Sequence, residues 1–330
     1  MSRLDELIAE LCPNGVEYIP LGEVLKNNNA PNSISKKYYK ENGDIPIIDQ
    51  SQVYIAGYTD DESAVPPILP CIIFGDHTRV VKYADRKFAQ GDSGTKVFIP
   101  VTEDLNTKYI YYAFCNIDIP SRGYNRHWTI AKNIKIPIPP LPVQQEIVRI
   151  LDNFTELIAE LTAELTARKK QYEYYRDLLL TFGDEVEWCN LEEILKIRNG
   201  KDYKSFNVGN IPVYGSGGIM TYIDTYVYDK PSVLIPRKGS IDKLYYVEKP
   251  FWTVDTIFYT EIYTSKVIPK YVFYCLQKER LEQYNTAGGV PSLTQTVLNK
   301  VKIPVPPLEE QERIVAILDR FDALCNDLTS

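Results

Sequence analysis

The amino-acid sequence predicts an α+β protein, in which two mostly-β domains are joined by long, antiparallel, coiled-coil-like helices. Three observations predict this fold class. The sequence contains a long internal repeat, both copies of the repeat contain short β-type segments, and a heptad pattern follows the first copy. With 330 residues, the chain is also too long for one ordinary core.

The longest repeat is a proline-rich junction followed by a helical pattern. It occupies residues 136–154 as IPIPPLPVQQEIVRILDNF and residues 303–321 as IPVPPLEEQERIVAILDRF. Other pairs at similar offsets are VEYIPLGEVLK (16–26) with VEWCNLEEILK (186–196), KYIYYAF (108–114) with KYVFYCL (270–276), and, more weakly, DIPIID (44–49) with NIPVYG (210–215). A period this long indicates duplication of a whole module. Each module consists of a globular block, a proline-rich segment that we call the bracket (136–140 and 303–307) and a helix.

The two globular blocks have the pattern of small β domains. Tyr, Val and Ile are frequent in short alternating runs broken by Pro and Gly, as in SVLIPRKGSIDKLYYV (232–247). Residues 107–117 and 269–284 are expected to be helical instead, because their apolar residues recur every three or four positions.

A heptad pattern begins after Pro142 and continues without Pro or Gly until Gly183. Its seam positions, spaced by four and three, are Ile147, Leu151, Phe154, Ile158, Leu161, Leu165, Arg168, Tyr172, Tyr175, Leu179 and Phe182, and the second copy continues with Ile314, Leu318, Phe321, Cys325 and Leu328. A stripe this narrow needs a partner helix, so we expect the two helices to pair in antiparallel fashion. The alternative is a long surface helix lying on one domain.

The proline bracket has a structural interpretation. Proline fixes φ and lacks an N–H, so the bracket is expected to be extended, and a proline in the first helical turn loses no hydrogen bond. The bracket would then form a stiff elbow between each block and its helix. A proline-rich motif that binds a partner is the competing interpretation.

The net charge of −7 is unevenly distributed. Residues 20–141 hold 14 basic and 13 acidic residues, residues 188–306 hold 15 and 11, and the rest of the chain holds 8 and 20. The acidity therefore belongs to the helical segments, and the blocks are neutral to basic. The six cysteines are far apart, two histidines occur, and no apolar run is long enough for a bilayer. These features predict a cytoplasmic protein with no zinc site, disulfide framework or membrane partner.

No catalytic motif stands out. GDSGTK (91–96) lacks the spacing of a phosphate-binding loop, and GSGG (215–218) lacks the context of a dinucleotide site. A catalytic pair at Asp76 and His77, or at His127, lacks a third residue that would orient the base. We therefore expect no catalytic residue, cofactor or metal in this chain.

Both blocks instead carry basic residues interleaved with Tyr, Asn and Gly. The segments are SKKYYK (35–40), GDHTR (75–79) and RGYNRHW (122–128) in the first block, and RNGKDYK (198–204), PRKGS (236–240) and TAGGVPSL (286–293) in the second. Such residues can contact phosphates and base edges, and glycine permits close approach to a nucleic-acid backbone. One cluster alone is usually a solvated face, but their occurrence in both blocks favours nucleic-acid binding.

This organisation resembles the DNA-specificity (S) subunits of type I restriction-modification systems. The resemblance covers the whole chain and rests on KIPIPPLPVQQEIVRILD (135–152), KIPVPPLEEQERIVAILD (302–319) and ELTARKKQYEYYRDLLLTF (164–182). The opening LDELIAELCPNGVEYIPLGEV (4–24) is also similar.

The resemblance implies four regions. These are a target-recognition domain with a short N-terminal helix (1–141), a spacer helix (142–183), a second target-recognition domain (184–306) and a second spacer helix (307–330). The second spacer has five seam positions against eleven in the first, so we expect it to be truncated relative to the family. That departure puts in doubt the family's pseudo-cyclic closure through the N-terminal helix at Leu4 to Leu11.

The resemblance also implies a function without chemistry in this chain. Each target-recognition domain would read half of a bipartite, asymmetric site in double-stranded DNA. The helices would set the spacing and dock two methyltransferase (M) subunits, which use S-adenosylmethionine. Restriction (R) subunits would join through them and use ATP with Mg. The DNA contacts carried over are Lys36, Lys37, His77, Arg79, Arg122, Asn125, Arg126, Arg198, Lys201, Lys204, Arg237, Lys238, Ser240 and Ser292. A coiled-coil assembly protein and an enzyme using Asp76 and His77 are the alternatives.

Overall fold

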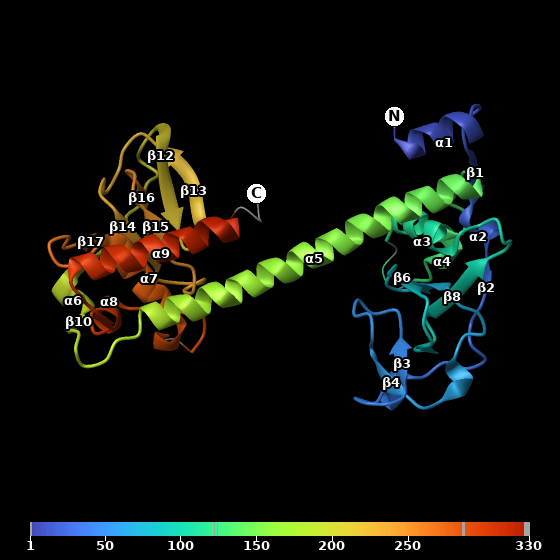
Figure 1. The fold of residues 1–330 in the computed structure, drawn as a ribbon, viewed down its shortest axis with the longest axis horizontal. Coiled ribbons are helices and arrows are strands. Elements are labelled where there is room, and N and C mark those ends of the chain that lie inside the picture. The colour runs from blue at the N-terminus through green and yellow to red at the C-terminus, as the bar shows by residue number, and fades with distance from the viewer. Residues whose placement is uncertain (1, 122, 124, 286–287, 327–330) are drawn as a thin grey trace. The chain divides into compact units, whose positions relative to one another are not determined.

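The structure, a computed structural model, describes residues 2–121, 123, 125–285 and 288–326. It divides into two compact units, Met1–Ala159 and Glu160–Ser330, and the boundary falls within one helix, α5 (Leu141–Leu179). Both units combine strands and helices, which confirms the α+β prediction (Figure 1). Within the described ranges, no helix has the length and apolar character needed to cross a membrane.

The first unit is built on two sheets and a separate strand pair. The larger sheet is antiparallel and has the order β2 (Leu25–Asn27), β8 (Thr95–Pro100), β5 (Cys71–Gly75), β6 (Val81–Ala84). The smaller has the order β4 (Gly57–Thr59), β3 (Ile45–Ile48), β7 (Ala89–Gln90), and β1 (Glu17–Pro20) pairs with β9 (Lys135–Ile138). The helices are α1 (Arg3–Leu11), α2 (Leu21–Val24), α3 (Thr107–Cys115), α4 (Trp128–Ala131) and the 3-10 turns η1 (Lys36–Tyr38) and η2 (Glu62–Ala64).

The second unit repeats this topology strand for strand. Its larger sheet has the order β11 (Leu195–Asn199), β17 (Ile257–Ile262), β14 (Ser232–Pro236), β15 (Tyr245–Val247), and its smaller sheet the order β13 (Gly218–Ile223), β12 (Val208–Gly215), β16 (Trp252–Thr253). β10 (Trp188–Asn190) pairs with β18 (Lys302–Pro304). The helices are α6 (Leu191–Ile194), α7 (Pro269–Lys278), α8 (Gln295–Leu298), α9 (Leu308–Asn326) and the 3-10 turn η3 (Leu281–Tyr284). The duplication predicted from sequence is therefore present in the fold.

Two of the repeated motifs pair with each other in each unit. β1, from the VEYIP motif, lies antiparallel to β9, from the bracket, with Tyr18 opposite Pro137. In the second unit, Cys189 of β10 lies opposite Ile303 of β18. The bracket is thus extended, as predicted, and the start and end of each block are joined before the helix begins.

A buried glutamine fastens each bracket to its helix. Gln144 is 1% exposed and Gln311 is fully buried. The Gln144 side chain accepts from the Asn106 main-chain N–H (2.9 Å) and donates to the Pro139 carbonyl (2.8 Å). The Gln311 side chain accepts from the Ile268 N–H (2.8 Å) and donates to the Pro306 carbonyl (2.8 Å). The same elbow is therefore built twice from the same contacts.

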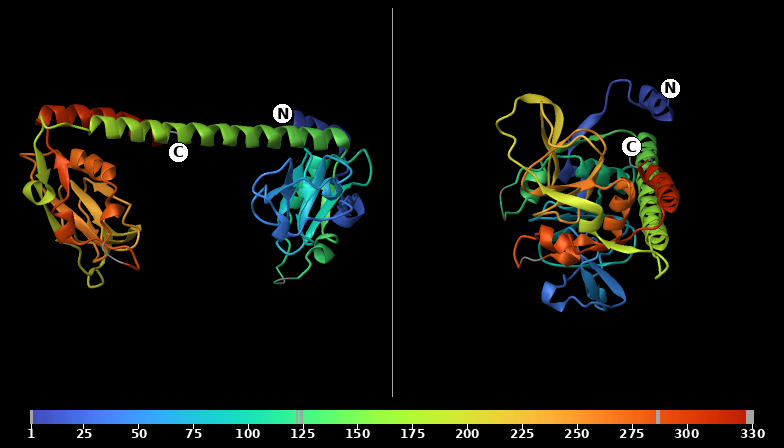
Figure 2. Two further views of the ribbon diagram at one scale, coloured as in Figure 1. Left: turned by 90° about the horizontal axis from the view of Figure 1, so that it is seen from below. Right: turned by 90° about the vertical axis from the view of Figure 1, so that its left-hand side faces the viewer.

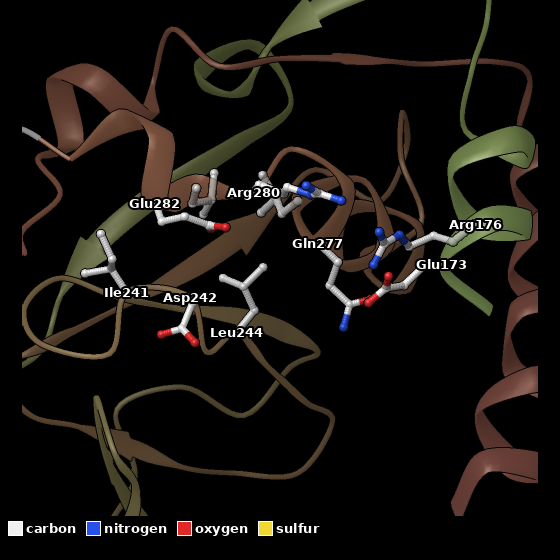
Figure 3. Close-up of a pocket in the computed structure, with 10 residues that line it drawn as sticks. Glu173, Arg176, Ile241, Asp242, Leu244, Gln277, Arg280 and Glu282 are labelled. Atoms are coloured by element: carbon white, nitrogen blue, oxygen red, sulfur yellow. The ribbon is translucent and has the colours of Figure 1, made fainter. Parts of the chain in front are cut away.

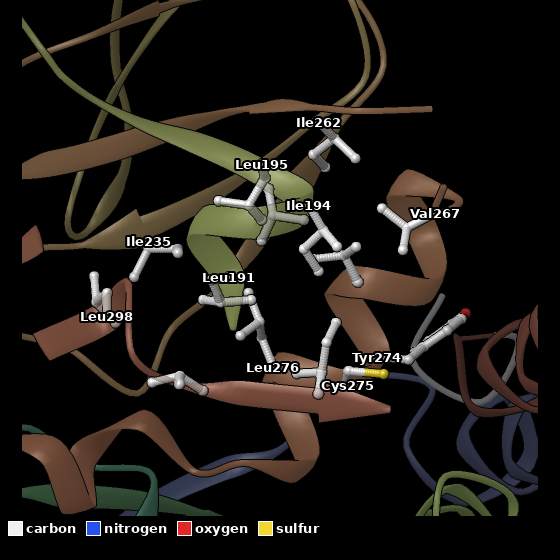
Figure 4. Packing of buried hydrophobic residues seen from close by; sticks show 14 of the residues in the cluster. Leu191, Ile194, Leu195, Ile235, Ile262, Val267, Tyr274, Cys275, Leu276 and Leu298 are labelled. Atoms are coloured by element: carbon white, nitrogen blue, oxygen red, sulfur yellow. The ribbon is translucent and has the colours of Figure 1, made fainter. Parts of the chain in front are cut away.

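Each unit has its own hydrophobic core beside its larger sheet. In the first, the Trp128 ring stacks on Phe98 at a centroid distance of 4.1 Å and packs on the same cluster as Phe74 and Phe114. In the second, helices α6, α7 and α8 contribute Leu191, Leu276 and Leu298 to one cluster (Figure 4). This cluster also includes Ile314 and Leu318 of α9, so α9 belongs to the fold of the second unit.

The later part of α5 pairs with α9 inside the second unit. The Tyr175 and Phe321 rings stack at a centroid distance of 5.3 Å, and an Arg168 guanidinium N–H donates to the Leu324 carbonyl. Residue numbers rise along α5 as they fall along α9, so the helices are antiparallel, as predicted (Figures 1 and 2).

Two helices end earlier than their patterns predict. α5 ends at Leu179 rather than near Phe182, and the Lys278 ammonium donates to the Leu180 carbonyl (2.8 Å), where it satisfies a group that another helical turn would have used. The segment 269–284 is interrupted after α7, because Arg280 has a left-handed backbone (φ 48°) that a helix cannot contain.

Candidate nucleic-acid interface

Four loops of the first unit meet beyond one end of its sheets. We call residues 49–51, 76–79, 91–94 and 125–128 the first loop cluster. Gln50, which is 6% exposed, accepts from the His77 main-chain N–H (3.2 Å) and donates to the Asp92 carboxylate (2.9 Å). Its carbonyl accepts from the Thr78 hydroxyl (2.6 Å). One glutamine thus connects three of the four loops.

Asp76 connects the fourth loop to the others. Its main-chain N–H donates to the Gly94 carbonyl (2.8 Å), and its carbonyl accepts from the His127 main-chain N–H (2.8 Å). Its carboxylate accepts from the Trp128 main-chain N–H (2.8 Å) and lies 3.6 Å from the Lys96 ammonium. The loop before α4 is therefore fixed against the turn that follows β5.

The second unit builds a corresponding second loop cluster from residues 215–217, 237–240, 254–256 and 291–293. The Arg237 main-chain N–H donates to the Thr256 carbonyl (2.8 Å), and the Arg237 carbonyl accepts from the Leu293 N–H (2.9 Å). The Ser216 N–H donates to the Thr256 hydroxyl (3.3 Å). Because the strands correspond one to one, three of these loops follow or precede the same strands as those of the first loop cluster, and the fourth precedes α8 as residues 125–128 precede α4.

Most predicted contacts of the first block lie on the first loop cluster. His77 and Arg79 follow β5, and the exposed Asn125 and Arg126 precede α4. The Arg79 guanidinium donates to the Ile119 carbonyl (2.9 Å), and the Arg79 backbone is left-handed.

Two predicted contacts of the first block lie outside the cluster. Lys36 and Lys37 are exposed on η1, beside the smaller sheet. Arg122 lies outside the described residues.

In the second block, Arg237, Lys238, Ser240 and Ser292 lie on the second loop cluster, and Lys238 and Ser292 form a β-bridge. The bridge brings together two segments, PRKGS and the described part of TAGGVPSL, that are far apart in the sequence. Lys238 is exposed, and the Arg237 guanidinium lies 5.8 Å from the centre of the Phe258 ring.

The remaining predicted contacts of the second block follow β11 or lie in it. Arg198 makes a two-point ion pair with the Glu261 carboxylate, at 2.9 and 3.0 Å, and these hydrogen bonds raise the pKa of Arg198. Lys201 and Lys204 are exposed, and the Lys201 N–H donates to the Thr253 carbonyl, next to the second loop cluster. Gly200 is required there, because a Cβ would lie 1.9 Å from the Val254 carbonyl oxygen.

The predicted seam residues differ in burial. Phe154, Ile158 and Leu161 in the middle of α5 are 59%, 62% and 43% exposed, whereas Ile314 and Leu318 are fully buried. Ile147, Leu151, Leu165, Tyr172, Tyr175, Leu179 and Phe321 are half-buried. Leu328 and the Cys325 side chain lie outside the described residues.

Several residues that hold the clusters together were not among the predicted site residues, notably Gln50, Asp92, Ser216 and Thr256. Their contacts join distant loops and follow no period. The glycine-rich stretches GDSG and GSGG were a usable signal, because both form turns of the two clusters. In the sequence alone, these stretches resemble nucleotide-binding loops but lack the spacing or context that such loops require.

Not every basic residue of the first block adds positive charge to its surface. Lys82 is buried, and its ammonium donates to the Asp49 and Val53 carbonyls at 2.7 Å. Burial lowers the pKa of Lys82, an effect that the nearby Asp49 partly offsets. Lys82 therefore supports the loop after β3 from within.

The geometry offers no support for catalysis at Asp76 and His77. The Asp76 carboxylate is occupied by the Trp128 N–H and Lys96, which makes it a structural group. Among the described residues, no group of three or more His, Cys, Asp and Glu could hold a metal ion. A pocket of about 260 Å³ in the second unit is lined by Glu173, Asp242 and Glu282 as well as Arg176 and Arg280, a charge balance that does not favour an anionic ligand (Figure 3).

Comparison with known proteins identifies the family of this chain. The family described as "Type I restriction modification DNA specificity domain" matches residues 13–168 and again residues 183–330, once for each copy of the repeat. The chain belongs to this family. The resemblance found in the sequence is thereby confirmed.

Two curated members of the type I specificity family, both from Escherichia coli, align with all of this chain. The EcoR124I/EcoR124II specificity subunit is 33% identical, with 91% of its length covered, and the EcoprrI specificity subunit is 30% identical, with 93% covered. The crystal structure of an S subunit from M. genitalium has a TM-score of 0.63 at 18% identity, covering 96% of this chain and 94% of that one. That structure supports the fold.

Proposed function

We propose that this chain is the sequence-specific DNA-recognition subunit of a type I restriction-modification complex, with each loop cluster reading one half of a bipartite site in double-stranded DNA. One observation carries the proposal: the same fold builds the same loop cluster twice, each time with exposed basic side chains, Arg79 and Arg126 in the first and Lys238 in the second. The side chains differ between the clusters, since the turn after β5 carries His77 and Arg79, whereas the turn after β14 carries Lys238 and Ser240. The two half-sites should therefore differ in sequence.

The chemistry of the complex would belong to other subunits. Membership of the specificity family supports a chain that recognises DNA rather than modifies it. Methyltransferase subunits that use S-adenosylmethionine would dock on the helices, two of them to match the repeat, and restriction subunits using ATP with Mg would join through these. No residue of this chain is assigned a catalytic role.

Replacing Arg237 and Lys238 together with alanine is expected to weaken binding to the cognate duplex by at least about tenfold. Log K for binding falls as log salt rises, and each phosphate that a protein neutralises adds about 0.9 to the magnitude of this slope. Removing both side chains should therefore reduce the magnitude of the slope by about one to two. The measurement is a salt titration of duplex binding by fluorescence anisotropy, with the full chain in its methyltransferase complex.

The matched control replaces Lys230 and Lys249 with alanine. Both are exposed, and they lie near the opposite end of β14, because Ser232 pairs with Val247 there. The control has the same change in charge and should retain the wild-type slope. Equal slopes for all three proteins would contradict the placement of the DNA on the second loop cluster.

A further inference from the structure

Asp76 is a charged residue inside a surface that is otherwise suited to binding DNA. It is 3% exposed, and a buried carboxylate is unfavourable unless hydrogen bonds and an opposite charge stabilise it. Asp76 has both, the Trp128 N–H at 2.8 Å and the Lys96 ammonium at 3.6 Å. Its negative charge is thus compensated within the protein.

The Trp128 side chain is anchored independently of Asp76. Its ring stacks on Phe98 at 4.1 Å and lies 6.0 Å from the Phe74 ring, within the hydrophobic core. Those ring contacts fix α4 against the hydrophobic core. The carboxylate accepts from the main-chain N–H where α4 begins. Together with the bond from the His127 N–H to the Asp76 carbonyl (2.8 Å), it holds the end of the loop that includes Asn125 and Arg126.

The second unit holds its corresponding loop without a carboxylate. The turn after β14 begins with Arg237, whose carbonyl accepts from the Leu293 N–H at 2.9 Å, and the Gly239 N–H donates to the Pro291 carbonyl at 3.0 Å. Together these two hydrogen bonds form the antiparallel Lys238–Ser292 bridge. Main-chain pairing alone holds the loop there, whereas in the first unit the Asp76 carboxylate adds to the main-chain bond from the His127 N–H to the Asp76 carbonyl.

We propose that Asp76 is a positioning residue for DNA recognition, which fixes the loop before α4 so that Asn125 and Arg126 meet the first half-site. The inference rests on the proposed function. It adds that base preference in one half-site depends on a residue that does not itself touch DNA, while the other half-site is independent of it.

The test compares the sequence preferences of the wild type and of Asp76→Ala, Asp76→Asn and Asp85→Ala. Each full chain is co-expressed with its methyltransferase subunits, and bound members of a randomised DNA duplex library are selected and sequenced. Asp85 is an exposed acid that follows β6, and Ala84 pairs with Cys71, so it lies at the end of the sheet away from the cluster. Asp85→Ala therefore removes the same charge without disturbing the loops.

Asp76→Ala is expected to lose about tenfold or more of the base preference in one half of the selected motif and to leave the other half unchanged. Asp76→Asn should keep that preference within about threefold, because its amide oxygen can still accept from the Trp128 N–H. Rescue by asparagine separates positioning by a hydrogen bond from a general loss of folding, and it remains informative if the alanine variant does not fold.

Three results would overturn the proposal: an unchanged motif for Asp76→Ala, a loss spread evenly over both halves, or a loss in Asp76→Asn as large as in Asp76→Ala. A wild-type complex that selects no motif at all would instead contradict the proposed function. The two failures are therefore distinguishable in one experiment.

Discussion

Gln311→Ala is expected to lower the free energy of unfolding of the second unit by about 3 kcal/mol, because buried polar groups that lose their partners cost about 1–3 kcal/mol each. The side-chain oxygen of Gln311 accepts from the Ile268 N–H, and its nitrogen donates to the Pro306 and Lys266 carbonyls at 2.8 and 3.2 Å. Alanine removes all three bonds and leaves a small cavity. Urea denaturation with hydrogen–deuterium exchange resolves the effect by unit.

The repeat supplies a matched variant for this prediction. Gln144→Ala removes the same contacts from the first bracket, to Asn106, Pro139 and Asp104, and should destabilise the first unit by a similar amount. Gln145→Ala, at the exposed neighbouring position, should change stability by less than about 0.5 kcal/mol. If Gln144→Ala and Gln145→Ala were equally mild, the buried glutamines would not be what fastens the brackets.

The fold was predictable from sequence where a pattern repeats or has a period. The offset between the two brackets reveals the duplication, and seam residues such as Tyr175 and Phe321 indicate the antiparallel helix pair. The end of α5 was not predictable, because it depends on Lys278, which is distant in sequence from Leu180. The two-residue strands β7 and β16 are also too short to show an alternating pattern.

The candidate site was predictable in composition but not in assembly. Basic residues identified the segments after β5 and β14, since such residues are common where proteins contact nucleic acid. Nothing in the sequence says that Asp76 meets Trp128, or that Lys238 meets Ser292. These contacts depend on how strands far apart in the chain pair, and a side chain such as Asp76 looks like a solvated acid until that pairing is known.

Leu318→Ala and Leu151→Ala are expected to differ strongly, although both change the same residue at the same place in the repeat. Leu318 is fully buried, with Ile314 beside it and Tyr172 and Leu179 of α5 packed on the same cluster. Truncating a buried leucine costs about 2–5 kcal/mol, so we expect about 4 kcal/mol for Leu318→Ala. Leu151 is half-buried, and its truncation should cost about 1 kcal/mol.

The difference follows from the helix that covers each copy. In the second unit α9 packs on α7, and Tyr172 and Leu179 of the later part of α5 lie on the same cluster, so Leu318 is buried where Leu151 stays partly open. Urea denaturation of the two variants, resolved by unit through hydrogen exchange, measures the difference directly. Equal losses would mean that pairing with α5 adds nothing to the burial of α9. A large loss for Leu318→Ala alone would show that the elements packed around Leu318 stabilise the second unit more than those around Leu151 stabilise the first.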